Sequence, residues 1–100
     1  KSESSGSVTV MLYEDPANAQ AAYQVLAAGM ADADPTTGVG EEALLWTFSA
    51  TVLDIKVESG ELGFRRCGAV VDIVMGTSDG DVLTAYGKRL DARLSEVVCR

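Results

Sequence analysis

The two cysteines are the side chains of this 100-residue chain best suited to covalent chemistry. Cys67 follows two arginines, and positive charge beside a thiol stabilises the thiolate that acts as nucleophile or metal ligand. The chain contains no histidine, which excludes Cys–His pairs, Ser–His–Asp triads and the common zinc sites within it. No general base and no helix N-terminus are expected near Cys67, and a two-cysteine metal site would need carboxylates to complete it. We therefore expect no catalytic residue, no metal site and no cofactor.

A disulfide between Cys67 and Cys99 explains the two cysteines better than separate reactive thiols. A strand over residues 69–75 carries the chain roughly 23 Å away from Cys67, and a helix over residues 81–97 brings it back by roughly 25 Å. The bridge would contribute on the order of 3.5 kcal/mol in the chain-entropy model. Helical periodicity places Cys99 away from the core face, so the helix must unwind by its last residues. Two unpaired thiols, or a bridge between chains through Cys99, are the alternatives.

Carboxylate-rich motifs are the other candidates for chemistry, and each has a simpler explanation. Residues 78–81 (SDGD) resemble a calcium loop, but the required spacing is absent and a helix N-cap fits better. Residues 38–42 contain two glycines, but Glu41 and Glu42 stand where a phosphate needs N–H groups and positive charge. Adjacent exposed carboxylates can act as acid and base, yet they usually form a solvated surface.

Charge divides the chain into an acidic part and a nearly neutral part. The whole chain has 15 acidic and 8 basic residues, for a net charge of −7. Up to Phe64 the only basic residues are Lys1 and Lys56, whereas the remainder is close to neutral. Nucleic acids and anionic lipids need a dense basic face, so this balance argues against both as partners. A cationic partner, or plain solubility, fits the charge better.

The chain is expected to hold a flexible tether and one folded domain. Residues 1–7 are short, polar and Ser-rich, as tethers are, and residues 8–100 would form a single domain. No apolar run approaches the ~18 residues that suggest a membrane span. We expect membrane attachment only through a segment upstream of Lys1.

Apolar periodicity predicts an α+β fold. Asp15 and Pro16 are typical of a helix start, and a second helix should begin at the cap-type residues near Asp79. Placing both helices on the apolar face of an antiparallel sheet of three to five strands gives a two-layer sandwich. Its order would be β-α-β-β-β-α, possibly with one extra strand. The expected strands are 8–13, 44–48, 52–58, 62–66 and 69–75, and the expected helices are 16–31 and 81–97.

Two tight turns set the expected register of the central strands. With two-residue turns at Ser59-Gly60 and Cys67-Gly68, every strand presents the same apolar face, although neither Ser59 nor Cys67 favours the positive φ of a type I′ turn. On the other face, this register sets Asp54 opposite Arg65, and Lys56 and Asp72 beside Gly63. The apolar face would then contain Leu53, Ile55, Val57, Leu62, Phe64, Val71, Ile73 and Met75.

The polar face of the expected sheet also carries two valines. Such apolar residues on an outer face indicate that a partner or a second copy of the domain partly covers it. A homodimer through this face is therefore one hypothesis. The candidate interface residues are Val70, Val74, Lys56, Asp72, Arg65 and Asp54.

Three short segments resemble parts of small bacterial extracytoplasmic lipoproteins and of extracellular sensor domains of actinobacterial receptor kinases. They are GVGEEA at residues 38–43, FRRCG leading into the valines at residues 64–71, and LDARL at residues 90–94. The resemblance implies a location outside the cytoplasmic membrane, a tether like residues 1–7, and ligand or partner sensing without catalysis. It transfers no binding residue to this chain.

These observations support a secreted or membrane-tethered module that binds or senses an unknown protein or small ligand without catalysis. A small subunit that dimerises through the outer sheet face is the first alternative. An enzyme that uses carboxylates alone is the second, and it would need a pocket that holds carboxylates with raised pKa values.

Overall fold

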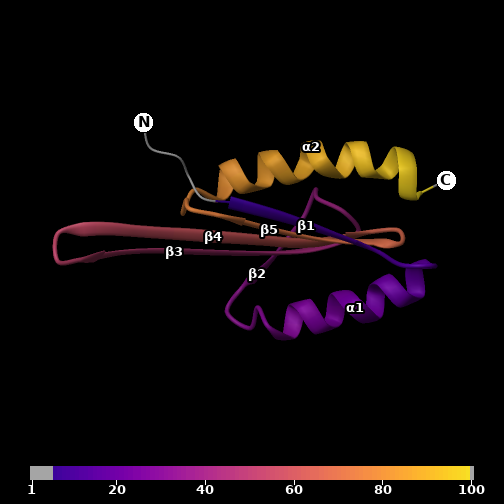
Figure 1. Ribbon diagram of the computed structural model, residues 1–100, viewed down its shortest axis with the longest axis horizontal. Helices are drawn as coiled ribbons and strands as arrows, with labels where there is room; N and C mark the ends of the chain where they lie inside the picture. Colours follow the sequence, from indigo (N-terminus) through magenta and orange to yellow (C-terminus); the bar gives the residue numbers. More distant parts are fainter. Residues whose placement is uncertain (1–5, 100) are drawn as a thin grey trace.

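The computed structural model describes residues 6–99 and has an α+β fold. Five antiparallel strands form one sheet in the order β1-β5-β4-β3-β2, which Figure 1 shows edge-on between two helices. The short β2 was not expected, and the strands expected at 52–58 and 62–66 are joined in the single strand β4. The elements are β1 (Gly6–Leu12), α1 (Pro16–Ala28), β2 (Asp34–Thr36), β3 (Glu42–Val52), β4 (Ile55–Arg66), β5 (Ala69–Met75) and α2 (Gly80–Val98).

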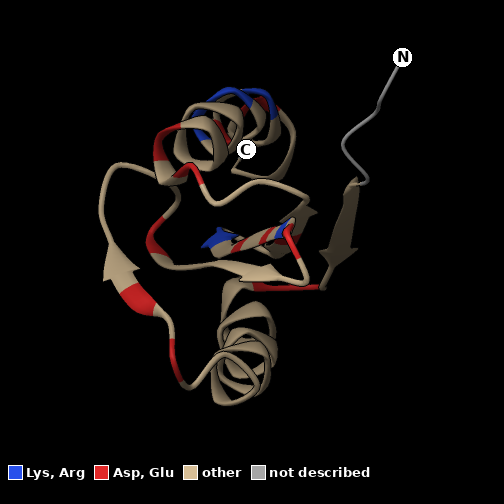
Figure 2. Cartoon of the chain, turned by 90° about the vertical axis from the view of Figure 1, so that its left-hand side faces the viewer, with Lys and Arg blue, Asp and Glu red and all other residues tan. Residues whose placement is uncertain are grey.

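The two helices lie on opposite faces of the sheet, so the expectation that both cover one face was wrong (Figure 2). Val70 and Val71 explain the difference, because successive side chains of a strand point to opposite faces and both valines are fully buried. Val71 packs in the core under α2, whereas Val70 packs against Ala19 and Tyr23 of α1. The molecule therefore has three layers, with β5 and residues 60–66 of β4 covered on both sides.

The larger core lies between the sheet and α2. It contains Val39 and Ala43 together with four buried residues of β4 and β5, and Leu83 of α2 completes it. Tyr86, Leu90 and Leu94 of α2 also pack against this core, whereas Val97 near the end of the helix is exposed. The buried residues of β4 and β5 in this cluster are Leu62, Phe64, Val71 and Ile73.

The two helix starts agree with the sequence. Asp15 caps α1, because its Oδ1 accepts a hydrogen bond of 2.8 Å from the backbone N–H of Asn18. Asp79 caps α2 in the same way through the backbone N–H of Asp81, at 3.0 Å. The first helix ends at Ala28, three residues before the expected end, with Gly29 as its C-cap.

The turn expected at Ser59-Gly60 is wrong, since both residues lie inside β4. The chain turns instead at Leu53-Asp54, where both residues have positive φ angles of 50° and 65°. Gly60 is needed inside the strand because a Cβ there would lie 2.6 Å from the carbonyl oxygen of Thr77 and would collide with Leu83. This contact allows the start of α2 to approach the sheet closely.

The turn at Cys67-Gly68 and the register that it implies are confirmed. Phe64 pairs with Val71 and Gly63 pairs with Asp72, as expected. Of the two turn residues only Cys67 has a positive φ, of 50°, which is the pattern of a type II′ rather than a type I′ turn.

Two further expectations concern the tether and membrane attachment. Residues 6 and 7 of the expected tether belong to β1, and residues 1–5 lie outside the described residues. Among the described residues, neither helix has the length and apolar character that a membrane crossing requires.

Candidate functional site

The structure does not bring the six predicted interface residues together on an exposed face. Val70 is buried beneath α1, and Arg65 is held in ion pairs with Glu41 and Glu42 at 2.6 and 2.8 Å. Lys56 pairs with Thr51 instead of lying beside Gly63. Asp54 stands at the β3–β4 turn rather than opposite Arg65, where Glu42 is found. Val70, Asp72 and Val74 share the α1 side of β5, where Val70 is buried and the other two are partly buried.

The two cysteines form the expected disulfide at the end of the sheet opposite the β3–β4 turn. The Cα atoms of Cys67 and Cys99 are 5.5 Å apart, and α2 ends at Val98, so Cys99 has left the helix as expected. The carboxylate of Glu41 lies within 4.8 Å of both sulfurs. Because the sulfurs are bonded to each other, neither offers the thiolate that a metal or a nucleophilic reaction needs.

Arg66 and Asp91 form an ion pair that supports the disulfide end. Both oxygens of Asp91 accept hydrogen bonds of 2.7 Å from Arg66, and Oδ2 also accepts one of 2.8 Å from the backbone N–H of Gly40. The hydrogen bonds from Arg66 lower the pKa of the Asp91 carboxyl, more than its burial raises it. The same hydrogen bonds raise the pKa of Arg66. Because the two charged groups bind each other, the ion pair connects β4 with α2 next to the disulfide and has a structural role.

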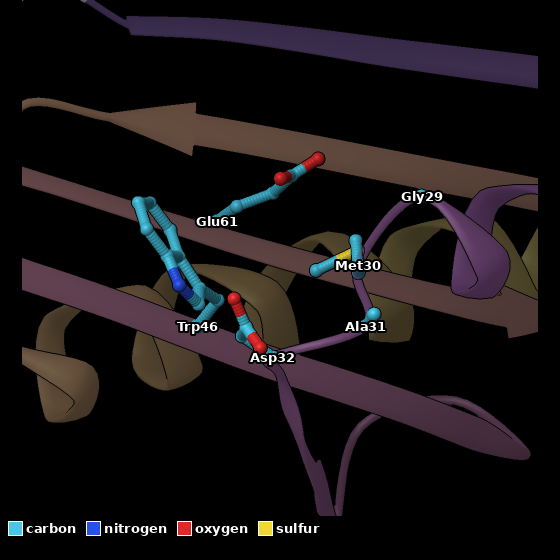
Figure 3. A pocket seen from close by; sticks show the side chains of 6 residues that line it. All are labelled: Gly29, Met30, Ala31, Asp32, Trp46 and Glu61. Atoms are coloured by element: carbon cyan, nitrogen blue, oxygen red, sulfur yellow. The ribbon is translucent and has the colours of Figure 1, made fainter.

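A pocket of about 340 Å³ lies where α1 ends above β3 and β4 (Figure 3). Trp46 rises from β3, Glu61 from β4, and Met30 and Asp32 come from the segment after α1. Trp46 and Glu61 face each other in the strand register, which explains why they share the floor of the pocket. We call this the acidic pocket, and its lining consists of Gly29, Met30, Ala31, Asp32, Trp46 and Glu61.

Glu61 shares its side of the sheet with Asp72, on the neighbouring strand β5. Glu61 pairs with Val74 and Asp72 pairs with Gly63, so the two carboxyl groups are diagonal neighbours on one face. A hydrogen bond with Asp72, together with burial and the negative charge of Asp72, raises the pKa of Glu61 to about 7. Oδ1 of Asp72 is buried and has no hydrogen-bond partner among the described residues. A buried carboxylate oxygen without a donor destabilises this arrangement unless a ligand or proton satisfies it.

Trp46 provides an aromatic surface next to these carboxyl groups. Its ring stacks on Phe48 with a centroid distance of 6.1 Å and an interplanar angle of 7°. It is partly buried and lines the pocket. Trp46 and Asp32 also line a second hollow, of about 260 Å³, which adds Asp34 to the carboxylates nearby.

Sequence reasoning found only part of this site. Asp72 was placed correctly beside Gly63, but neither Glu61 nor Asp32 was recognised. The misplaced turn at Ser59-Gly60 put Glu61 at the start of a strand and removed Trp46 from its partner. A continuous pairing of β3 with β4 would have revealed that Trp46 and Glu61 are opposite each other.

Comparisons with family models, curated proteins and solved structures returned no match for this chain. The resemblance to extracytoplasmic lipoproteins and sensor domains therefore stays a prediction.

Proposed function

We propose that the chain is a non-catalytic extracytoplasmic binding module whose acidic pocket receives the cationic group of a small ligand. The observation that carries the proposal is that Glu61 lines the pocket beside Trp46 and has the carboxyl group of Asp72 as its diagonal neighbour. Glu61 lines the cavity next to an aromatic surface, Asp72 lies beside it on the neighbouring strand, and neither carboxyl group has a basic partner among residues 6–99.

A cation satisfies this site better than a neutral or anionic ligand does. Two carboxyl groups held close together repel each other when both are ionised, and a positive charge nearby removes that repulsion. A cation over the face of a tryptophan gains a further 0.5–2 kcal/mol, roughly, depending on how far it is desolvated. Asp32 adds a third carboxylate at the pocket rim, and no Lys or Arg is among the lining residues.

The disulfide supports a location in an oxidising compartment. A bridge between Cys67 and Cys99 persists in extracytoplasmic environments and is reduced in most cytosols. The resemblance to extracytoplasmic sensor domains points in the same direction, and membrane attachment would then come from a segment upstream of Lys1.

The fluorescence of Trp46 provides a direct test, because it is the only tryptophan of the chain. Choline is a suitable probe, and 3,3-dimethylbutanol has the same shape without the charge. We expect choline to change the Trp46 emission in a saturable way and dimethylbutanol to have little effect. Equal responses to the two compounds, or no response to either, would overturn the cationic ligand.

Two isosteric variants locate the binding. Glu61→Gln removes a carboxyl group from the pocket, whereas Glu14→Gln removes the same charge before α1, at the far end of this helix. A 13-residue helix separates the two positions by roughly 20 Å. We expect Glu61→Gln to weaken choline binding at least about tenfold, a loss of about 1.4 kcal/mol, and Glu14→Gln to leave it nearly unchanged.

A carboxylate-based enzyme is the second candidate, and one observation favours it. A pKa of about 7 suits Glu61 to act as a general acid or base at neutral pH. The other side chains of the pocket are those of Met30, Ala31, Asp32 and Trp46, and they include no nucleophilic hydroxyl or thiol. Turnover of nitrophenyl glycosides or esters that Glu61→Gln abolishes would replace binding with catalysis.

A further inference from the structure

The β3–β4 hairpin extends beyond the rest of the sheet as a two-stranded arm, which we define as residues 47–59. In the described residues β5 pairs with β4 only from Gly60 onward, and β2 pairs with β3 only at residues 43–45. Figure 1 shows the arm projecting past both helices. Its base is fixed to the start of α2, because Glu58 accepts hydrogen bonds from the N–H and the hydroxyl of Ser78 at 3.2 and 2.7 Å.

The two faces of the arm have opposite character. The face on the side of α2 carries Thr51, Lys56 and Glu58, together with Thr47 and Ser49. The face on the side of α1, which we call the apolar face of the arm, consists of Phe48, Ala50, Val52, Ile55 and Val57, with Ser59 at its base opposite Phe48.

Most of the apolar face is exposed to solvent. Isolated two-stranded hairpins are marginally stable in water, and an exposed apolar patch at the end of such a hairpin usually contacts a partner. Leu53 at the tip adds to this surface although its positive φ disfavours a large side chain. The exposed fractions are 90% for Leu53, 64% for Ile55, 55% for Val52, 45% for Phe48 and 42% for Val57.

We propose that the apolar face of the arm binds the same face of a second copy of this chain, in an antiparallel two-fold dimer. Two copies of a chain with a net charge of −7 repel each other over most of their surfaces. The apolar face contains no charged residue, so two copies can meet there without opposing like charges. A two-fold contact needs one patch that is complementary to itself, and a flat apolar ribbon meets this requirement.

The geometry of the molecule leaves room for a second ribbon. The arm begins where α1 ends, so the space beneath its apolar face continues the layer that α1 occupies (Figure 1). Two sheets pack face to face at about 10 Å, which is also about the diameter of a helix with its side chains. In an antiparallel arrangement the tip of each arm, with Leu53, reaches the base of the other, near Trp46.

A lipid bilayer fits the arm less well than a second copy does. Insertion would bury both faces of the ribbon, and Thr51, Lys56 and Asp54 would enter the hydrocarbon with the apolar residues. The acidic chain is also repelled by anionic lipid headgroups. We therefore assign the apolar face to protein–protein contact.

The size of the ribbon predicts a weak dimer. Each face measures roughly 20 Å by 10 Å, so the contact falls below the ~1,200 Å² that stable complexes bury. Light scattering and sedimentation of the whole chain, from micromolar to millimolar concentration, should show a reversible monomer–dimer equilibrium. A chain that stays monomeric throughout this range would overturn the proposal.

Two matched double variants identify the interface. Ile55→Lys with Val57→Lys places two positive charges on the apolar face, and Ser49→Lys with Thr51→Lys places the same charges on the polar face. We expect the first pair to weaken dimerisation at least about tenfold and the second pair to leave it unchanged or to strengthen it slightly by lowering the net charge. Equal effects of both pairs, or none from the first, would contradict the assignment.

Two further measurements test whether the variants fold and whether the apolar face of the arm binds lipid instead. Because the arm lies outside both cores, thermal unfolding should show that both double variants retain the folded domain. Sedimentation with phosphatidylcholine vesicles tests the lipid alternative. Binding of the original chain to these vesicles, lost in the Ile55→Lys and Val57→Lys variant, would assign the face to lipid and overturn the dimer.

Discussion

At one end of the sheet the disulfide and the Arg66–Asp91 pair connect β4, α2 and the loop at Gly40. At the other end the arm leaves large apolar side chains in solvent. The two regions share β4, because Arg66 is its last residue and the arm contains its first residues. Charged side chains at the first end have nearby partners, whereas those on the arm form one ion pair among residues 6–99, between Lys56 and Glu58 at 3.7 Å. The comparison indicates that the first end stabilises the fold and that the second is available for binding.

The largest effect should come from the disulfide. Replacing Cys67 and Cys99 with serine removes a crosslink that closes a loop of 32 residues, and we expect a loss of about 3.5 kcal/mol in unfolding free energy. Urea denaturation measures this loss. Reductant should destabilise the original chain by a similar amount and leave the serine variant unchanged. An unaltered urea midpoint in the serine variant would contradict the stabilising role of this end.

Two leucines compare the core with the arm directly. Leu83 is fully buried under α2, so Leu83→Ala should cost about 3 kcal/mol through lost burial and the cavity left behind. Leu53→Ala removes the same atoms from the exposed tip and should change stability by less than about 0.5 kcal/mol. Thermal unfolding of dilute protein gives both values. Similar losses for the two variants would show that the arm packs against the domain.

Asp91 and Asp54 provide the corresponding comparison for charge. Asp91→Asn leaves Arg66 partly buried without its carboxylate, and we expect a loss of about 2 kcal/mol at neutral pH. Asp54→Asn, at the exposed turn of the arm, should have almost no effect.

The stabilisation by Asp91 should also depend on pH. Folding lowers the pKa of this carboxyl, so its contribution is present above the unfolded value near 3.8 and is lost as the pH falls through the folded pKa. The Asn variant should therefore lose less stability on acidification than the original chain. Parallel pH profiles of the two proteins would contradict the ion pair.

Glu61 should have a smaller effect than Asp91, with the opposite pH dependence. Its pKa rises from 4.5 to about 7 on folding, so folding favours the protonated form. Its stabilising contribution is present below pH 4.5 and is lost as the pH rises through about 7. Because solvent screens this partly exposed pair, we expect Glu61→Gln to stabilise the domain at pH 8 by only about 1 kcal/mol. Urea denaturation at pH 5 and pH 8 checks the sign; a variant that is less stable at pH 8 would contradict it.

Local signals in the sequence predicted the stabilising end well. The N-cap at Asp15, the turn at Cys67-Gly68 and the helix that returns Cys99 to this turn are all confirmed. Each depends on residues close in sequence or on the lengths of two adjacent elements. The partners of Arg65 were wrong because they come from the segment at Glu41 and Glu42, more than twenty residues away.

The arm and the acidic pocket were not predicted, for a common reason. Ser59-Gly60 is a plausible turn by composition, and it competes with Leu53-Asp54, which has a poor residue at positive φ. The turn forms at Leu53-Asp54 because this register pairs β3 with β4 over eleven residue pairs and places Gly60 where α2 approaches the sheet. This choice produces both the arm and the Trp46–Glu61 pair.

The sequence alone determined the α+β class, the helix starts, the alternation of each strand and the closure of the disulfide, because these follow from local geometry and chain length. Only the tertiary structure decided which helix covers which face of the sheet. Alternation marks two faces of a strand, but Val70 and Val71 are both apolar, and nothing local assigns one to α1 and the other to α2. That assignment leaves the apolar face of the arm uncovered and places the end of α1 over the acidic pocket.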